Sequence, residues 1–238
     1  MILLFKLLLA HLLADFLLQP DSWVADKERH LHKSPKLYLH IALHFVCMSL
    51  IVWDTEYLPL ILSITILHGI IDYLKLRYQK KKRVAFFADQ TAHILVIVLG
   101  VILFENTGGL TFEWKDNYMI ILTGLVWITL PSSVVIKNII SLWDAQIQIR
   151  STALETKSLL NAGKMIGILE RLLVFIFILV NHWEAVGFLI TAKSVFRFSD
   201  LKQAQDRKLT EYILIGTLLS FGIAIVTALC VQFFINQL

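Results

Sequence analysis

The chain has 238 residues and only two cysteines, Cys47 and Cys230, both inside apolar segments. Two buried thiols exclude a disulfide framework, and they also argue against a structural zinc site built from thiolates. The sequence lacks a nucleophile elbow, a nucleotide-binding loop and a zincin motif. It also has no internal repeat and no linker of disordered composition. These absences favour one compact domain and remove the common soluble enzyme classes.

Apolar residues are abundant instead, at 57% of the chain, and apolar runs of membrane-spanning length recur from end to end. The sequence therefore predicts an all-α polytopic membrane helix bundle. The first run is expected to stay in the mature chain, because His11 and Asp15 interrupt it and no small-residue cleavage pattern comes after it. About eight transmembrane helices are expected, near residues 1–19, 36–53, 57–76, 84–104, 118–137, 164–182, 183–198 and 211–235.

Basic residues orient the predicted bundle. Most Lys and Arg residues fall in the connections after the first, third, fifth and seventh helices, including Lys27 and Lys33 and the run at residues 80–83. By the positive-inside rule these connections are cytoplasmic and both termini lie outside. The net charge of +4 thus reflects topology. It does not indicate a nucleic-acid partner, because the basic run has no aromatic interleaving.

Four of the first apolar segments carry a polar pair with a spacing of four residues, which puts both members on one helix face. The pairs are His11 with Asp15, His40 with His44, His68 with Asp72, and Asp89 with His93. Their order reverses with the predicted helix direction, so all four pairs are expected at the same depth near the cytoplasmic side. A carboxylate-rich layer would then lie over an imidazole layer, and the pairs would share one site.

Imidazole nitrogens together with carboxylate oxygens suit a divalent transition metal. Zn²⁺ ranks first, with Mn²⁺ or Fe²⁺ open, and all eight residues of the pairs are candidate ligands. They exceed the needs of one tetrahedral ion, so either two ions bind or some groups orient the ligands. Asp15, Asp72 and Asp89 are the candidate catalytic carboxylates. The alternative is a purely structural polar cluster.

A second polar set lies in the later helices. Gln19, Glu170, Arg171, Lys193 and Arg197 are candidates for binding an anionic lipid head group, because Arg presents paired donors to phosphate. In the alternative interpretation, the cations snorkel to the interface and Glu170 pairs with a neighbouring cation. We expect one membrane domain over residues 1–238, with a metal-site half at 1–104 and a supporting half at 105–238. Pro131 predicts a kink in the fifth helix, and residues 138–163 a cytoplasmic connection.

The segment His11-Leu-Leu-Ala-Asp15-Phe-Leu-Leu-Gln19-Pro20, with His68-Gly69-Ile-Ile-Asp72 and Asp89-Gln90-Thr-Ala-His93, resembles bacterial integral membrane proteins of domain of unknown function family 3307. The segments at Gly167–Arg171, Ala192–Ser194 and Glu211–Thr217 extend the resemblance over most of the chain. The His/Asp helices are also similar to membrane-bound metal-dependent hydrolases of bacterial inner membranes. That second similarity implies hydrolysis.

Two classes of function are consistent with these patterns. In the first, one or two ions activate water to hydrolyse a lipid-like ester or phosphate, so that membrane lipid is the partner. In the second, the His and Asp side chains form a route for metal ions or protons. The first is favoured because the pairs occupy one leaflet, whereas a permeation path needs polar groups in both. A role as a structural partner subunit and a homo-oligomeric state stay open.

Overall fold

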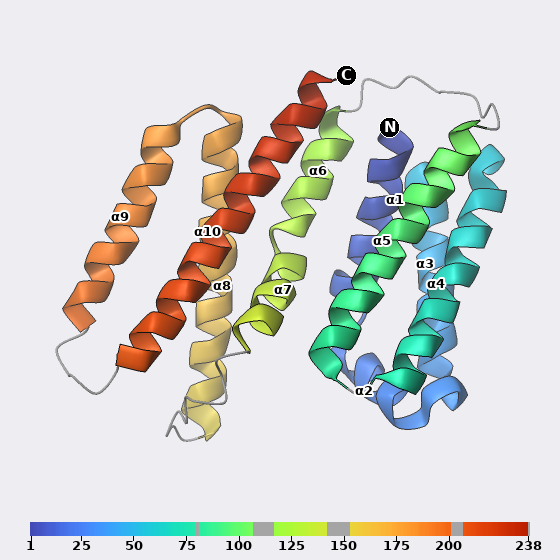
Figure 1. The fold of residues 1–238 in the computed structure, drawn as a ribbon, viewed down its shortest axis with the longest axis horizontal. Coiled ribbons are helices and arrows are strands. Elements are labelled where there is room, and N and C mark those ends of the chain that lie inside the picture. The colour runs from blue at the N-terminus through green and yellow to red at the C-terminus, as the bar shows by residue number, and fades with distance from the viewer. Residues whose placement is uncertain (80, 107–116, 142–152, 201–206, 238) are drawn as a thin grey trace. The chain divides into compact units, whose positions relative to one another are not determined.

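The computed structural model describes residues 1–79, 81–106, 117–141, 153–200 and 207–237. Within these ranges every regular element is a helix, which confirms the predicted all-α class. The chain divides into an N-terminal unit, Met1–Thr123, and a C-terminal unit, Gly124–Leu238, which are described separately. Figure 1 gives the order of the helices.

The N-terminal unit contains α1 (Ile2–Leu12), α2 (Asp21–His30), α3 (Pro35–Val52), α4 (Leu58–Tyr78) and α5 (Lys82–Asn106). Helix α3 packs between α1 and α4, and α5 contacts both α4 and α1, so four long helices enclose a common interior. The short α2 lies at one end of these helices (Figure 1). It packs against α3.

The entry into α2 is irregular. After α1 the backbone widens into a π-helical turn at Leu13–Leu17, in which the Leu18 amide donates to the Leu13 carbonyl. The chain then turns by 82° into the segment Asp21–Lys33. Sequence analysis predicted one straight helix over residues 1–19 and a connection after it, so both the π turn and α2 differ from that expectation.

The interior of the N-terminal unit has two chemically different ends. One end is an apolar core formed by α1, the second halves of α3 and α5, and the first half of α4. Its members are Leu7, Ala10, Met48, Val52, Leu60, Ile61, Ile64, Ile97 and Val101. The opposite halves of the same helices carry the four His/Asp pairs. Because α3 runs antiparallel to α1 and α4, and α5 antiparallel to α4, pairs from distant parts of the sequence meet there.

Most of α6 (Asn117–Trp127) also belongs to the N-terminal unit, and its end belongs to the C-terminal unit. The C-terminal unit further contains α7 (Leu130–Ile140), α8 (Ala153–Leu179), α9 (Trp183–Asp200) and α10 (Arg207–Asn236). Helix α10 packs against α8 and α7, and α9 packs against α8. The predicted fifth helix breaks at Thr129, before Pro131, which lies in the first turn of α7. Helix α8 begins earlier than predicted. The rest of the predicted connection, at residues 142–152, lies outside the described residues.

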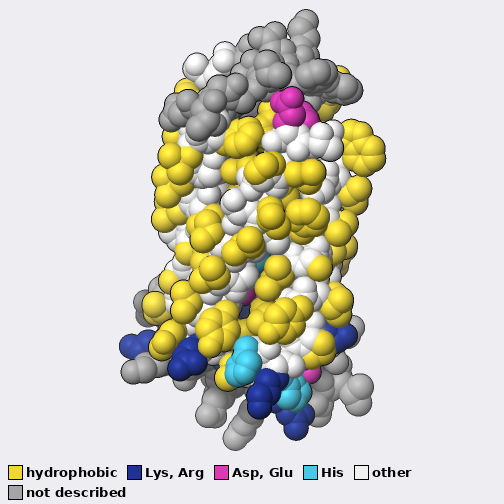
Figure 2. Space-filling model, turned by 90° about the vertical axis from the view of Figure 1, so that its right-hand side faces the viewer, with side chains coloured by type: hydrophobic (Ala, Val, Ile, Leu, Met, Phe, Trp, Pro, Cys, Tyr) yellow, Lys and Arg dark blue, Asp and Glu magenta, His cyan; other side chains and the backbone are white. Residues whose placement is uncertain are grey.

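Among the described residues, five helical segments are long and apolar enough to cross a membrane, and the bent pair at the N-terminus brings the number to six. The five are Pro35–Val52, Thr55–Tyr78, Lys82–Phe104, Asn117–Ile140 and Ile213–Asn236. These segments support a membrane protein, and the count of eight remains a prediction. Figure 2 shows an outer face with hydrophobic side chains over its middle and with Lys, Arg and His gathered at one end. Such a surface suits a bilayer.

Candidate metal centre

The eight residues of the four pairs meet inside the N-terminal unit. Helix α1 and its π turn supply His11 and Asp15, and α3, α4 and α5 supply one pair each. All five imidazoles are buried, with exposed fractions of 2% or less. The side chain of Asp15 is 9% exposed, and Asp72 and Asp89 are buried. Sequence analysis predicted this convergence from helical spacing alone.

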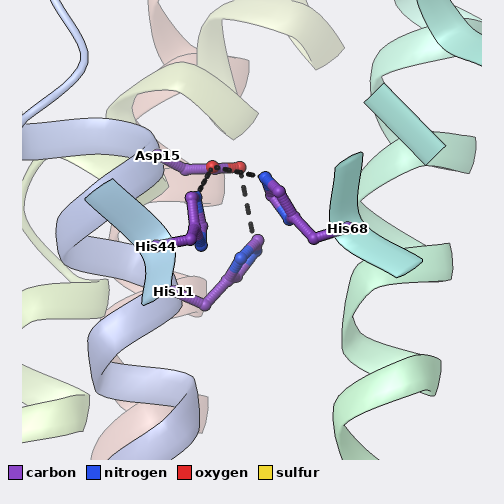
Figure 3. Close-up of side chains that lie close together, drawn as sticks. All are labelled: His11, Asp15, His44 and His68. Carbon is purple, nitrogen blue, oxygen red and sulfur yellow. Dashed lines mark hydrogen bonds and ion pairs between the residues drawn. The ribbon is translucent and has the colours of Figure 1, made fainter. Parts of the chain in front are cut away.

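Asp15 lies at the middle of the cluster, surrounded by imidazoles (Figure 3). Its Oδ1 atom is 2.8 Å from His44 Nε2 and 3.2 Å from His40 Nε2. His68 Nε2 is 3.9 Å from the same oxygen, and His11 Nε2 is 3.8 Å from Oδ2. Four imidazole rings from three helices therefore direct the same type of nitrogen at one carboxylate.

The imidazoles also contact one another. His68 stacks on both His44 and His93, with ring centroids 3.7 and 4.0 Å apart. The Nε2 atoms of His40 and His68 are 3.2 Å apart. Two such nitrogens attract only if one carries a proton or if both bind the same cation. The cluster is therefore arranged so that a shared cation or proton stabilises it.

The Nδ1 atoms of the histidines differ in their surroundings from the Nε2 atoms that face Asp15. The Nδ1 atoms of His11, His40, His44 and His93 are buried and have no hydrogen-bond partner in the part of the chain that the structure describes. For His44, Asp15 Oδ1 is an acceptor at 2.8 Å and would hold the ring proton on Nε2 in the absence of an ion. A ligand at Nε2 would place the proton on Nδ1, so occupancy of the centre decides the tautomer.

Gln90 belongs to the cluster, although sequence analysis did not identify it. Its amide nitrogen donates to Asp15 Oδ2 at 2.9 Å and to Asp89 Oδ2 at 3.3 Å. Its Oε1 lies 3.4 Å from His11 Nε2. Gln90 follows Asp89 directly and so lacks the four-residue spacing that identified the pairs. The amide orients Asp15 and His11 relative to each other.

Two lysines complete the centre, and each pairs with one of the other carboxylates. Lys27 of α2 donates to Asp72 Oδ2 at 2.8 Å, and Lys75 of α4 donates to Asp89 Oδ2 at the same distance. Lys27 is itself buried, at 6% exposure. Sequence analysis used both lysines only as markers of topology. The spacing of three between Asp72 and Lys75 was a possible signal, but Lys75 bonds to the neighbouring helix.

Charge balance distinguishes Asp15 from the other two carboxylates. Lys27 neutralises Asp72 and Lys75 neutralises Asp89, whereas Asp15 contacts imidazoles and the Gln90 amide. With neutral imidazoles the cluster carries one net negative charge, which is costly to bury without a cation. One divalent ion would change this to one positive charge. Two ions would leave three positive charges, so the balance favours one ion.

The spacing of potential ligand atoms gives three overlapping groups in the described residues, with the atoms of each group within 4.8 Å of one another. The groups are His11, Asp15, His44 and His68; His40, His68 and Asp72; and Asp72, Asp89 and His93. Only the first combines four ligands with the carboxylate that lacks a lysine. It is therefore the best candidate for an ion.

Of the residues predicted to bind a lipid head group, Glu170 and Lys193 contact each other, and Arg171 contacts groups of its own unit. Arg171, in the C-terminal unit, donates to the carbonyls of Ile128 and Thr129 at the break between α6 and α7, and to the hydroxyls of Ser133 and Ser220. Its guanidinium thus satisfies backbone groups that the helix break exposes.

Glu170 forms an ion pair with Lys193 of α9, in agreement with the alternative interpretation of that residue. Gln19 belongs to the N-terminal unit, where its amide nitrogen is buried without a partner among the described residues. The side chain of Arg197 lies outside the described part of the chain.

Comparisons with known proteins give one match. No curated protein and no solved structure matches the chain. A sequence model of the family described as "Protein of unknown function (DUF3307)" matches residues 3–121. This range contains all four His/Asp pairs, Gln90 and both lysines of the centre, whereas the later segments of the resemblance lie beyond it. The chain therefore belongs to the DUF3307 family, and its match to that family coincides with the helices that build the centre.

Proposed function

We propose that the N-terminal unit binds one divalent ion through His11, Asp15, His44 and His68, and uses it to hydrolyse a lipid-like ester or phosphate. The observation that carries the proposal is the position of Asp15, which faces four imidazole Nε2 atoms and has no lysine partner among the described residues. Three imidazoles and one carboxylate suit Zn²⁺, with Mn²⁺ or Fe²⁺ as alternatives, and hydrolysis would need one further coordination position for water.

An ion at this position would supply an acidic bound water. The loaded cluster would carry one positive charge, and hydroxide would neutralise it. His40, 3.2 Å from Asp15, and His93, beside Asp89, lie outside the proposed ligand set and are placed to accept or return a proton. Hydrolysis would join the oxygen of water to carbon or phosphorus and break the ester bond, and the proton accepted by His40 or His93 would pass to the leaving alkoxide.

The position of the centre in the bundle supports an amphiphilic substrate. The cluster occupies the end of the N-terminal unit at which α2 packs, and the apolar core fills the opposite end. We place the polar end at the cytoplasmic leaflet of a bacterial inner membrane, with both termini outside, on the basis of the basic connections. A lipid in that leaflet would bring its polar group to the level of the cluster.

Transport of a metal ion or proton uses the same residue types. The apolar core argues against it, because a conducting path needs polar groups along its whole length, and residues such as Ile61 and Met48 are fully buried among other apolar side chains. We therefore rank hydrolysis above transport.

Metal analysis of detergent-purified protein tests the binding step. Wild-type protein should contain one divalent ion per chain, and Asp15→Asn should contain almost none, because the amide removes the charge that binds the cation. Glu56→Gln, an exposed residue beyond the other end of α3, is the matched control and should retain the metal. Full occupancy in Asp15→Asn would refute the proposed ligand set.

Reconstitution with a bacterial lipid extract tests the chemistry. Wild-type protein should release a water-soluble head group or phosphate, and both chelation and Asp15→Asn should abolish the release. Metal-dependent ion flux without a lipid product would refute hydrolysis and support transport instead.

A further inference from the structure

We infer that the substrate is a phosphate ester, and that the ammonium groups of Lys27 and Lys75 bind its non-bridging oxygens. This inference rests on the proposed function and specifies its substrate class. It arises from the two lysines that the structure adds to the His/Asp pairs.

The first argument is the number of donors. An ammonium group has three N–H donors. In the described part of the chain, Lys27 Nζ has one acceptor, Asp72 Oδ2, and Lys75 Nζ has one acceptor, Asp89 Oδ2. Four donors therefore remain available at the edge of the cluster. Phosphate offers several charged acceptor oxygens, whereas a carboxylic ester offers one neutral carbonyl.

The second argument is position. Both ammonium groups act electrostatically on Asp72, and Asp72 Oδ2 lies 3.7 Å from His40 Nε2, which in turn contacts Asp15. The lysines thus flank the proposed ligand set. A phosphate with one oxygen near Asp15 would have its other oxygens on the side of the lysines.

The third argument is access. The side chain of Lys75 is 29% exposed, whereas that of Lys27 is 7% exposed. One ammonium therefore lies at the rim and the other lies inside. Lys27 comes from α2, whose Val24 is exposed and whose neighbour Lys33 is a surface cation. A head group entering beside α2 would meet Lys75 at the rim and Lys27 within the centre.

The fourth argument is the net charge of the cluster with one divalent ion bound, which also favours a phosphate ester. One divalent ion leaves the cluster with a single positive charge when its bound water is neutral. A phosphate ester that binds as a monoanion before the water ionises would neutralise this charge, whereas a neutral ester would not. Burial makes this difference large, because an uncompensated charge is costly in an apolar environment.

Calorimetric titration of the full-length, Zn²⁺-loaded protein in detergent tests the inference. The probes are short-chain phosphatidic acid, short-chain diacylglycerol with the same acyl chains, and inorganic phosphate. Wild-type protein should bind phosphatidic acid and should bind diacylglycerol at least tenfold more weakly. Equal binding of the two lipids would overturn the inference. Inorganic phosphate that binds as tightly as phosphatidic acid supports phosphate recognition but identifies the free ion as the ligand.

Variants then assign the residues. Lys27→Met combined with Asp72→Asn keeps the charge balance and should weaken phosphatidic acid binding about tenfold or more. Lys75→Met with Asp89→Asn should act in the same direction. Lys33→Met, which removes an exposed cation near α2, is the control and should leave binding unchanged. An equal loss in Lys33→Met would show that surface charge alone attracts the lipid, and would overturn the inference.

Metal analysis of the wild-type protein distinguishes a failure of the proposed function from a failure of the phosphate inference. Wild-type protein without metal refutes the proposed function. Wild-type protein that contains metal but prefers diacylglycerol refutes only the phosphate inference. If the paired variants do not fold, Lys27→Arg decides the role of Lys27. Lys27→Arg keeps the charge, so its affinity for phosphatidic acid should stay within about tenfold of wild type. A wild-type protein that does not prefer phosphatidic acid to diacylglycerol would still overturn the inference.

Discussion

Lys27 on α2 and Asp72 on α4 form a buried ion pair, with 2.8 Å between Nζ and Oδ2. The two residues are 45 positions apart in the sequence and come from helices of very different character. The pair attaches the short polar helix to the end of the bundle where the His/Asp cluster lies. It also supplies one of the two cations of that cluster.

Removing one partner of this pair should be much worse than removing both. Lys27→Met leaves Asp72 buried without a cation and should lower the free energy of unfolding by about 3–5 kcal/mol. Lys27→Met with Asp72→Asn should recover most of that loss. Unfolding of the three proteins in one detergent measures the difference. A double variant as unstable as the single one would contradict the pairing.

Gln90 should affect metal affinity without binding the metal. Gln90→Ala removes the amide that orients Asp15 and His11, and affinity should fall by about 10- to 100-fold while the protein stays folded. Competition with a chromophoric chelator gives the affinity. Gln79→Ala, at the C-terminal end of α4, is the matched control. Unchanged affinity in Gln90→Ala would exclude this positioning role.

Arg171 should matter for stability and not for metal content. Arg171→Met leaves the carbonyls of Ile128 and Thr129 unsatisfied, and should lower the free energy of unfolding by about 3 kcal/mol or more. Lys164→Met, an exposed cation on the same helix, should have little effect. Calorimetry and metal analysis of the same samples make the test. A loss of metal in folded Arg171→Met would contradict it.

The proposed orientation can be checked by cysteine labelling. After Cys47 and Cys230 are replaced by serine, Lys33→Cys should be protected from a membrane-impermeant maleimide in intact cells. Glu56→Cys, between α3 and α4, should be labelled. Both introduced positions are exposed. The reverse pattern would invert the topology and move the centre to the other leaflet.

Much of the fold was predictable because hydropathy and the residues that begin and end helices are local features of the sequence. The limits of α3 and α4 agree with prediction within two residues, helped by Ser34, which caps α3, and Pro35 in its first turn. Helix α2 was not predicted because its composition is polar, whereas hydropathy identifies only apolar runs. Asp21 in its first turn and Lys27, Arg29 and His30 in its last turn were a usable signal.

The metal-ligating candidates were predictable for a related reason. A spacing of four residues on an apolar helix is visible in sequence and needs no tertiary information. Lys27, Lys75 and Gln90 could not be found in this way, because each acts on a carboxylate of another helix. The kink predicted at Pro131 is present as a break at Thr129. Proline suggests a break near itself, but the Arg171 contacts that stabilise it come from another helix.

The π-helical turn at Leu13–Leu17 makes the centre sensitive to chain length. A π turn contains one residue more than a regular turn, and Asp15 lies within it. Deletion of a single apolar residue there would restore regular geometry and rotate the next residues of the chain by about 100° about the helix axis. Substitutions of the apolar residues of this turn that keep its length should be tolerated far better than any one-residue insertion or deletion. For these residues, Asp15 excepted, the number matters more than the identity.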